Sequence, residues 1–415
     1  DRAGGAAAQL PSLSDCKNHE ALLSPLQLPQ DPAARAARDA LEAARAEAAA
    51  DVRTGRYAHG ESTLNQALST PEAPGLESAL ARLHTQRAQL HRIHARYVES
   101  ARDDVEAARL ALAARDEAAL ADAWISQLQT TGGFQNHFDE ARTWAVLSAP
   151  IIARLRDPER EGLRLVHLAT VEQHEDHTDE ALRDMLRARE LLAQSGPDSF
   201  NALRADEALA AFNNGRCEYE AARDAHARIL ERDERVFGKH HPRTLLSAVN
   251  LADDQTHLGQ LGPAEALLRD SLAAGTFVDR DAAWAHNRLA VVLRSHHDLK
   301  AALAEDEESV RLYTSLGPDG LEDLSWSLAD RGETLLALGR AAEAAADFKR
   351  SLDLRKDSSS DMRAEAMFGH ARATATKDRA AARDEATAAL AIYDGLPKEP
   401  CAKIEGDKIR AWLAR

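Results

Sequence analysis

The stretch Gly259–Leu268, which reads GQLGPAEALL, sets the register of the whole chain. Its turn glycine is followed two positions later by an apolar residue, Leu261, and three positions after that by the small residue Ala264. The spacing returns, degraded in places, in nine pairs: Tyr57/Gly60, Tyr97/Ser100, Phe138/Ala141, Thr178/Ala181, Tyr219/Ala222, Leu261/Ala264, Leu299/Ala302, Ala341/Ala344 and Arg379/Ala382. Successive second members lie 38 to 42 residues apart. A period this regular predicts an array of structural repeats.

Two further positions of each repeat carry small residues. Twelve residues before the small member of the pair lie Ala48, Ala88, Ala169, Ala210, Ala252, Ala290 and Gly332, whereas Gln129 and His370 break the pattern in the third and ninth repeats. Seven residues after it lie Ala67, Ala107, Ser148, Ala188, Ser271, Ser309, Ser351 and Ala389, with Ile229 as the exception. Two helices approach closely where no large side chain holds their backbones apart. We therefore predict helical hairpins that cross at these positions.

The composition favours helices and excludes some partners. Of 415 residues 44% are hydrophobic, but only 4% are aromatic, and the long runs of Ala, Leu, Arg and Glu contain strong helix formers. The formal charge is −16, from 52 basic and 68 acidic residues, which argues against binding nucleic acid or an anionic membrane. No run approaches the ~18 apolar residues of a transmembrane helix, so we expect no membrane insertion by this segment.

The segment Phe237–Leu245 (FGKHHPRTL), followed by Asn250-Leu-Ala252 and Gly259–Ala266, resembles the tetratricopeptide repeat (TPR) in the long form of kinesin light chains. The resemblance implies an all-α, right-handed superhelical solenoid of about nine TPR-like helical hairpins with a C-terminal capping helix. We expect the array at residues 32–396, the capping helix at 397–415 and a poorly ordered lead at 1–31. Asp31 and Pro32 suit the N-cap and first position of a helix. The pair Gly132-Gly133 departs from the pattern, and we expect it to interrupt the third hairpin.

Three further segments resemble the repeat region of certain bacterial transmembrane serine/threonine kinases. They are Ser14-Asp15-Cys16, Phe138–Trp144 and Ile404–Trp412. This resemblance implies a sensor or docking region outside the cytoplasm, in the periplasm, with a kinase domain upstream of Asp1. No kinase motif occurs in the chain itself. A free-standing cytoplasmic TPR adaptor and an enzyme of unknown class are the alternatives, and a homodimer stays open.

The sequence offers no catalytic, cofactor or metal signature. His84, His91 and His94 share one helix face, but no further ligands complete a zinc set, so we interpret them as partly exposed helix residues. No Walker loop, dinucleotide fingerprint or nucleophile elbow occurs. The three cysteines, Cys16, Cys217 and Cys401, indicate no disulfide framework, and we interpret Cys217 as a small packing residue. We therefore predict a binding protein without a cofactor.

The resemblance implies a peptide-binding groove, lined by the first helix of each hairpin. Its candidate residues are Arg204, Asn214, Asn250, Trp284, Asn287, Arg288, Arg294 and Trp326. Trp284 and Trp326 hold equivalent places in neighbouring repeats and predict an apolar anchor for a protein or peptide segment. The alternative is that both tryptophans belong to the core between repeats. Asn287 and Arg294 are the nearest equivalents of the residues that hold peptide carboxylates in the family.

Overall fold

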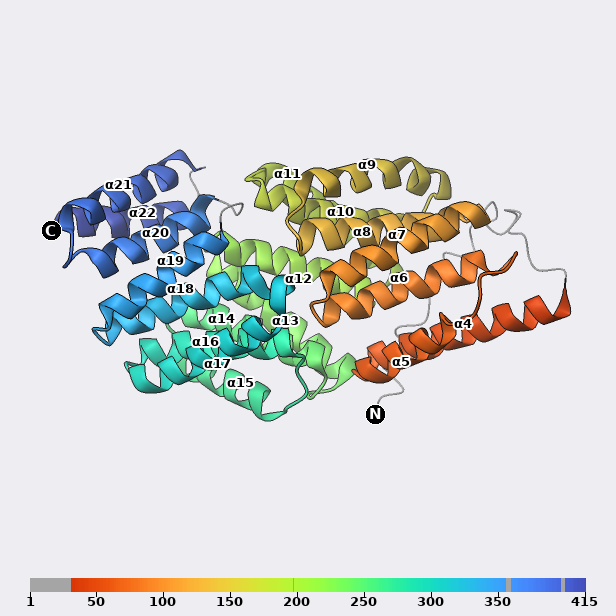
Figure 1. Ribbon diagram of the computed structural model, residues 1–415, viewed down its shortest axis with the longest axis horizontal. Helices are drawn as coiled ribbons and strands as arrows, with labels where there is room; N and C mark the ends of the chain where they lie inside the picture. Colours follow the sequence, from red (N-terminus) through yellow and green to blue (C-terminus); the bar gives the residue numbers. More distant parts are fainter. Residues whose placement is uncertain (1–30, 197, 356–359, 397–399) are drawn as a thin grey trace. The chain divides into compact units, whose positions relative to one another are not determined.

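The computed structural model describes residues 31–196, 198–355, 360–396 and 400–415. The predicted lead therefore lies outside the described residues, apart from Asp31. Within them there is no strand, and 19 α-helices follow one another (Figure 1). Their bounds are α4 (Pro32–Arg53), α5 (Tyr57–Ala67), α6 (Glu77–Ile93), α7 (Tyr97–Ala114), α8 (Glu117–Gly133), α9 (Phe138–Leu155), α10 (Pro158–His174), α11 (Thr178–Leu192), α12 (Phe200–Gly215), α13 (Tyr219–Phe237), α14 (Pro242–His257), α15 (Leu261–Ala273), α16 (Asp279–Ser295), α17 (Leu299–Ser315), α18 (Leu321–Ala337), α19 (Ala341–Leu354), α20 (Ser360–Thr374), α21 (Arg379–Gly395) and α22 (Pro400–Leu413). Short 3-10 helices span Ala193–Ser195 and Gly317–Gly320.

The helices α4 to α21 form nine consecutive hairpins, and α22 follows them. The second helix of each hairpin begins at the first residue of its predicted pair, from Tyr57 in α5 through Leu261 in α15 to Arg379 in α21. The predicted all-α array of helical hairpins and its register are thus confirmed. The expected helix cap is confirmed as well, since Pro32 is the first residue of α4 and Asp31 Oδ2 accepts a hydrogen bond from the Ala34 amide at 2.9 Å.

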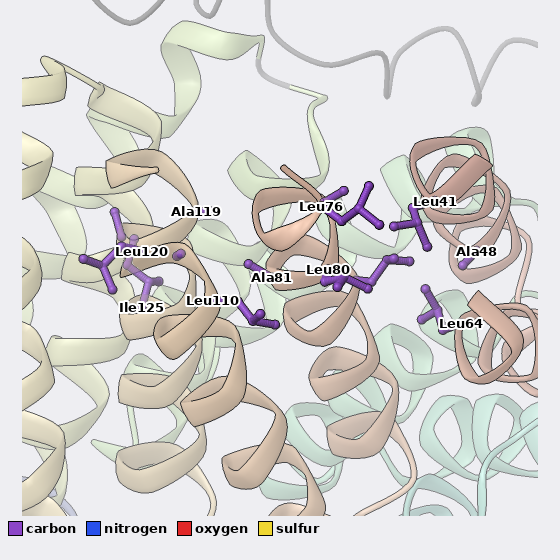
Figure 2. Close-up of a cluster of buried hydrophobic side chains, with 14 of the residues drawn as sticks. Leu41, Ala48, Leu64, Leu76, Leu80, Ala81, Leu110, Ala119, Leu120 and Ile125 are labelled. Atoms are coloured by element: carbon purple, nitrogen blue, oxygen red, sulfur yellow. The ribbon is translucent and has the colours of Figure 1, made fainter. Parts of the chain in front are cut away.

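The chain divides into two compact units. The first unit comprises residues 1–209 with 231–243, and the second comprises 210–230 with 244–415. The division passes through α12 and α13, a feature that the repeat pattern does not reveal. In the first unit Leu41 of α4, Leu64 of α5 and Leu80 of α6 meet in one buried cluster (Figure 2).

Small residues permit the close packing of the hairpins. Six second members of the predicted pairs are fully enclosed alanines: Ala141, Ala181, Ala222, Ala264, Ala302 and Ala344. At Gly332 a Cβ atom would lie 2.8 Å from Cζ of Phe348, closer than real Cβ contacts allow. The predicted gaps are therefore filled by the neighbouring helix.

The two repeats that lack a small residue twelve positions before the small member of the pair have a glycine nearby. In the third repeat a Cβ on Gly132 would lie 2.4 Å from Cγ2 of Val171, and in the ninth a Cβ on Gly369 would lie 2.3 Å from Cε1 of Phe348. Gly132 lies in the last turn of α8, which continues through Gly133. The expectation that this glycine pair interrupts the third hairpin is wrong, because α8 continues through both residues and Gly132 permits the close contact with α10.

Cys217 and Cys401 form a disulfide, with their Cα atoms 5.3 Å apart and a sequence separation of 184. Both belong to the second unit, Cys217 in the turn between α12 and α13 and Cys401 in the first turn of α22. The predictions of no disulfide framework and of a packing role for Cys217 are therefore wrong. Pairing depends on distance in space, and the second unit brings its last helix to this turn, which the spacing along the chain does not show.

The last helix, α22, packs against α20 and α21. Ile409 is buried there, and the ring of Trp412 meets that of Phe368 edge to face, with centroids 5.9 Å apart. Its predicted role as a solvating cap stays a prediction. None of the helices that the structure describes is both long and apolar enough to span a bilayer.

Candidate peptide-binding surface

A continuous chain of polar contacts joins the first helices of neighbouring hairpins in the second unit. Asn214 of α12 donates from Nδ2 to Asp253 Oδ2 of α14 at 3.2 Å. Arg288 of α16 donates from Nη1 to Asp253 Oδ1 at 2.9 Å and from Nη2 to Asp330 Oδ2 of α18 at 2.8 Å. Arg294, also on α16, donates from Nη2 to Asp330 Oδ1 at 3.2 Å. We call these five side chains the ladder.

The charges of the ladder alternate, and each stabilises its neighbours. Burial would raise the pKa of Asp253, but Arg288, His257 and Asn214 outweigh it and hold the pKa below its ordinary value. The pKa of Asp330 is lowered in the same way, since Arg288 and Arg294 outweigh its burial. Burial opposes the charge of Arg288, yet Asp253 and Asp330 raise its pKa above the usual range. Asp253, Arg288 and Asp330 therefore hold one another in their charged forms.

Asn287 and Arg294 serve the scaffold directly. Asn287 is 1% exposed, donates from Nδ2 to Asp330 Oδ2 at 3.1 Å and accepts from Nε of Arg288 at 3.0 Å. Arg294 donates from Nη1 to the Asp330 carbonyl oxygen at 3.0 Å and to Thr334 Oγ1 at 3.1 Å. The side chain of Arg294 keeps 20% exposure, whereas Asn287 is enclosed. Of the two, only Arg294 is open to a ligand.

The two tryptophans are each partly exposed and each lies beneath a guanidinium. The Arg288 Cζ atom lies 4.2 Å from the ring centroid of Trp284, and the Arg355 Cζ atom lies 4.3 Å from that of Trp326. Trp284 also packs against the buried cluster around Leu289. Such cation–π contacts hold the rings in place. Both residues are partly exposed, and their predicted role as an apolar anchor stays a prediction.

The remaining predicted residues, Asn250 and Arg204, do not belong to the ladder. Asn250 is partly exposed on α14, and no hydrogen bond of its side chain occurs among the described residues. Arg204 belongs to the first unit, unlike the other seven candidates. Its Nη2 atom lies 3.1 Å from Nε2 of His167. The structure thus brings Asn214, Asn287, Arg288 and Arg294 into one network and leaves Asn250 beside it on α14.

Sequence reasoning missed Asp330, which accepts from three of the predicted residues. Asp330 lies two positions before Gly332, and Arg288 lies two positions before Ala290. The same offset from Ala252 gives Asn250. Reading this offset in every repeat would have identified Asp330.

A buried polar group also occupies one recurring position of three second helices. Four residues after the small member of the pair lie Asp104, His226 and Asp306, where other repeats have Leu64, Met185 and Leu268. Asp104 Oδ2 lies 3.3 Å from Nη1 of Arg92, and His226 Nδ1 lies 2.6 Å from Asp254 Oδ2. Asp306 differs, because neither of its oxygens has a hydrogen-bond partner among the described residues.

Of the three predicted histidines, His84 and His91 surround one carboxylate, and His91 is buried rather than partly exposed. His84 Nδ1 lies 2.7 Å and His91 Nε2 3.3 Å from oxygens of Asp103, which also accepts two hydrogen bonds from Arg87. Asp103 is thus paired with the Arg87 guanidinium. Across the part of the chain that the structure describes, no group of three His, Cys, Asp or Glu side chains suits a metal ion.

Comparison with protein families identifies the repeats. A tetratricopeptide repeat model matches residues 201–275 and 281–357, which include the ladder residues Asn214, Asp253, Arg288, Asp330 and Arg294. These two segments are therefore tetratricopeptide repeats. No curated protein matches it.

Three solved structures are similar to this chain to different degrees. The Rap protein, crystallised in complex with Competence and Sporulation Factor, is similar with a TM-score of 0.51 at 12% identity, over 83% of this chain and 99% of that one. BtubC (BKLC) from P. vanneervenii has a TM-score of 0.38 at 19% identity, over 57% and 91% of the two chains. A putative kinesin light chain of Podosopora anserina has a TM-score of 0.36 at 20% identity, over 46% and 93%. At these identities the likeness concerns the fold alone.

Proposed function

We propose that this chain is a non-catalytic scaffold that binds an extended peptide or protein segment along the first helices of the second unit. The observation that carries the proposal is the ladder, which links α12, α14, α16 and α18 through Asn214, Asp253, Arg288 and Asp330. Side chains held in one geometry before binding lose little conformational entropy when a ligand arrives. Tetratricopeptide repeats supply this kind of interaction surface, and the similar Rap protein was crystallised with its factor.

The chemistry of the surface suits a peptide that offers both amides and apolar side chains. Asn250 has an amide with no competing partner among the described residues, so it can bond to a peptide backbone. Trp284 on α16 and Trp326 on α18 hold equivalent places in consecutive hairpins. Both residues are partly exposed and can contact apolar side chains of a peptide. The alternating charges of Asp253, Arg288 and Asp330 would reject a segment of uniform charge.

The finer prediction, a sensor or docking region of a bacterial serine/threonine kinase, rests on the sequence resemblance. The disulfide between Cys217 and Cys401 supports its extracytoplasmic placement, because disulfides persist in oxidising compartments and are rare in the cytosol. The cytoplasmic adaptor is disfavoured by the same bond. We propose the extracytoplasmic placement for this reason.

A displayed library of random dodecapeptides tests the binding function. A selected peptide is synthesised, and its Kd is measured by fluorescence anisotropy with Asn250→Ala, Trp284→Ala and the outer-helix control Arg311→Ala. We expect about tenfold weaker binding for the first two variants and no change for the control, whose side chain is 61% exposed on α17. Thermal melts establish that the variants are folded. Failure to select any peptide, or equal affinity in all variants, would contradict the proposal.

A further inference from the structure

The outer helices of the first unit carry a row of exposed apolar residues. Five residues after the small member of the pair lie Val105 on α7, Val146 on α9 and Leu186 on α11, and they are 54%, 71% and 38% exposed. Equivalent positions of consecutive repeats follow one another along one side of a repeat array, and we call these three side chains the belt. The other repeats have polar residues or alanine at this position, namely Asn65, Ala227, Arg269, Glu307, Lys349 and Thr387.

More apolar surface adjoins the belt. Nine large hydrophobic side chains are exposed among the described residues, and six of them lie on α7, α9 and α11. Besides the belt residues, these six include Val98, Leu112 and Leu147. Within the unit α7, α9 and α11 pack against α6, α8 and α10, which leaves the belt to solvent. Exposed apolar side chains that gather in this way mark a site of interaction.

The exposed apolar residues of α7 are spaced symmetrically. Val98 lies seven residues before Val105, and Leu112 lies seven residues after it, so the three share one face of the helix. A two-fold axis along the belt places α7 of a second copy antiparallel to the first. Val105 then meets its own counterpart, and Val98 of each copy meets Leu112 of the other. One symmetry operation therefore covers all three residues.

The charges beside the belt fit the same axis. On α11 Arg183 lies three residues before Leu186 and Glu190 four residues after it, and their side chains are 68% and 66% exposed. The axis brings Arg183 of each copy opposite Glu190 of the other, at two places in a dimer. On α9, the middle helix of the three, no charged residue occurs between Thr143 and Ala153.

The axis also brings two arginines of α7 together, Arg102 of one copy and Arg109 of the other. Arg109 is itself paired with Glu72 at 2.6 Å and with Glu106 at 2.7 Å. Arg102 therefore approaches a guanidinium that two carboxylates already neutralise, and this contact does not oppose the arrangement.

We propose that the first unit binds a second copy of this chain through the exposed faces of α7, α9 and α11, with a two-fold axis along the belt. A face three helices wide and about 25 Å long covers roughly 750 Å², close to the ~800 Å² that each partner buries in a stable interface. The formal charge of −16 opposes contact between two copies in general, so they meet where apolar residues and charges of both signs coincide. The ladder belongs to the second unit, and the dimer does not depend on the proposed peptide binding.

Sedimentation velocity of the full chain, measured over a range of concentrations, tests the dimer. We expect a monomer–dimer equilibrium with a Kd in the micromolar range or below. Val146→Asp brings two carboxylates together at the axis and should raise the Kd at least about a hundredfold. Leu321→Asp, which changes a 41% exposed leucine of α18 in the second unit, is the matched control and should leave the Kd unchanged.

Reversal of charge on α11 tests the axis itself. Arg183→Glu and Glu190→Arg each place like charges opposite one another, and each should raise the Kd about tenfold. An equimolar mixture of the two variants, or one chain that carries both changes, restores opposite charges at both places and should dimerise nearly as tightly as the unchanged chain. Thermal melts establish that each variant is folded.

Three results would overturn the inference. The first is an unchanged chain that sediments as a monomer at about 200 µM. The second is a Val146→Asp variant that dimerises as tightly as Leu321→Asp. The third is a doubly reversed variant that dimerises no better than the single variants, which would reject the axis along the belt.

Discussion

Arg288 donates from Nη2 to Oδ2 of Asp330 across 2.8 Å, and this contact joins α16 to α18. The same guanidinium reaches Asp253 on α14 at 2.9 Å. One side chain therefore connects the first helices of three consecutive hairpins. Since repeat arrays gain stability from contacts between neighbours, Arg288 contributes both to the scaffold and to the proposed binding surface.

Replacing Arg288 by alanine should destabilise the second unit. The change leaves Asp253 and Asp330 without their shared cation, at side-chain exposures of 10% and 19%. Loss of one partner from such a buried pair costs about 3 kcal/mol. Thermal unfolding followed by circular dichroism should show a melting temperature lower by several degrees.

Two variants serve as controls for this measurement. Arg288→Lys keeps a cation between the aspartates and should lose less stability. Arg311→Ala removes an exposed pair with Glu308 and should leave the melting temperature nearly unchanged. Equal melting temperatures for Arg288→Ala and Arg311→Ala would show that the ladder does not stabilise the unit.

The double variant Asn287→Ala with Arg294→Ala should lower the melting temperature as well as peptide binding. The sequence predicts that both residues contact a ligand in the groove. In the structure both donate hydrogen bonds to Asp330, Asn287 at 3.1 Å and Arg294 at 3.2 Å. Asn250→Ala, which breaks no hydrogen bond among the described residues, is the comparison. If the double variant binds peptide more weakly but melts at an unchanged temperature, the two residues contact the ligand and do not stabilise the scaffold.

The fold was open to prediction because its determinants are local and repeated. Each second helix begins where the pair pattern places it, as at Tyr219 and Leu261, because the turn residue and the small residue three positions on serve adjacent contacts. The repeats that break the pattern show its limit. In these repeats the small residue at the helix crossing is Gly132 or Gly369 instead. Its position depends on the side chain that it contacts on another helix, Val171 for Gly132 and Phe348 for Gly369.

The candidate site was less open to prediction for a geometric reason. Consecutive helix residues differ by about 100° in direction, so the neighbours Asn287 and Arg288 lie on either side of the boundary between interior and surface. Asn287 is enclosed, and Arg288 keeps 12% exposure. The Cys217–Cys401 bond depends on the path of the whole second unit, which no local pattern contains.

Reduction of the disulfide should destabilise the second unit. A cross-link that closes 184 residues removes about 5 kcal/mol of chain entropy from the unfolded state. Dithiothreitol should therefore lower the melting temperature of the unchanged chain and of Cys16→Ser, but not that of Cys217→Ser. A non-reducing gel should show faster migration for the first two proteins. If Cys217→Ser melts like the unchanged chain without reductant, the bond does not form in solution.

Gly369→Ala should be strongly destabilising, whereas Gly262→Ala should not. A Cβ on Gly369 would lie within 2.3 to 2.6 Å of three atoms of the Phe348 ring, which is itself buried. Overpacking of this kind costs about 1–3 kcal/mol. Gly262 lies in α15 with no atom within 4 Å of its Cβ position, and alanine there should gain up to about 1 kcal/mol of helix stability. Chemical denaturation measures both, and a tolerant Gly369→Ala would mean that Phe348 can move aside.

The stability of the second unit should fall as pH rises from about 4 to about 7, and Asp306 should account for part of this fall. Burial, with the nearby Asp330, raises the pKa of Asp306 from 3.8 to about 7, although Thr334, Arg294 and Arg331 act against it. In this range the folded chain holds a proton on Asp306 that the unfolded chain has released. Folding therefore takes up a proton, and the contribution present below pH 4 is lost as pH rises through the folded pKa.

Asp306→Asn removes this proton uptake while keeping the size of the side chain. Since one pKa unit corresponds to about 1.4 kcal/mol, the shift sets an upper bound of about 4 kcal/mol on the loss above pH 7. The variant and the unchanged chain should have similar free energies of unfolding at pH 4, and the variant should be more stable at pH 8. Urea titrations across this range give the free energy of unfolding of each protein as a function of pH. The contributions of other titrating groups, such as Asp281 and Glu365, are the same in both proteins and cancel in the difference. Parallel curves would show that Asp306 is already ionised in the folded protein, held by Arg294 and Arg331.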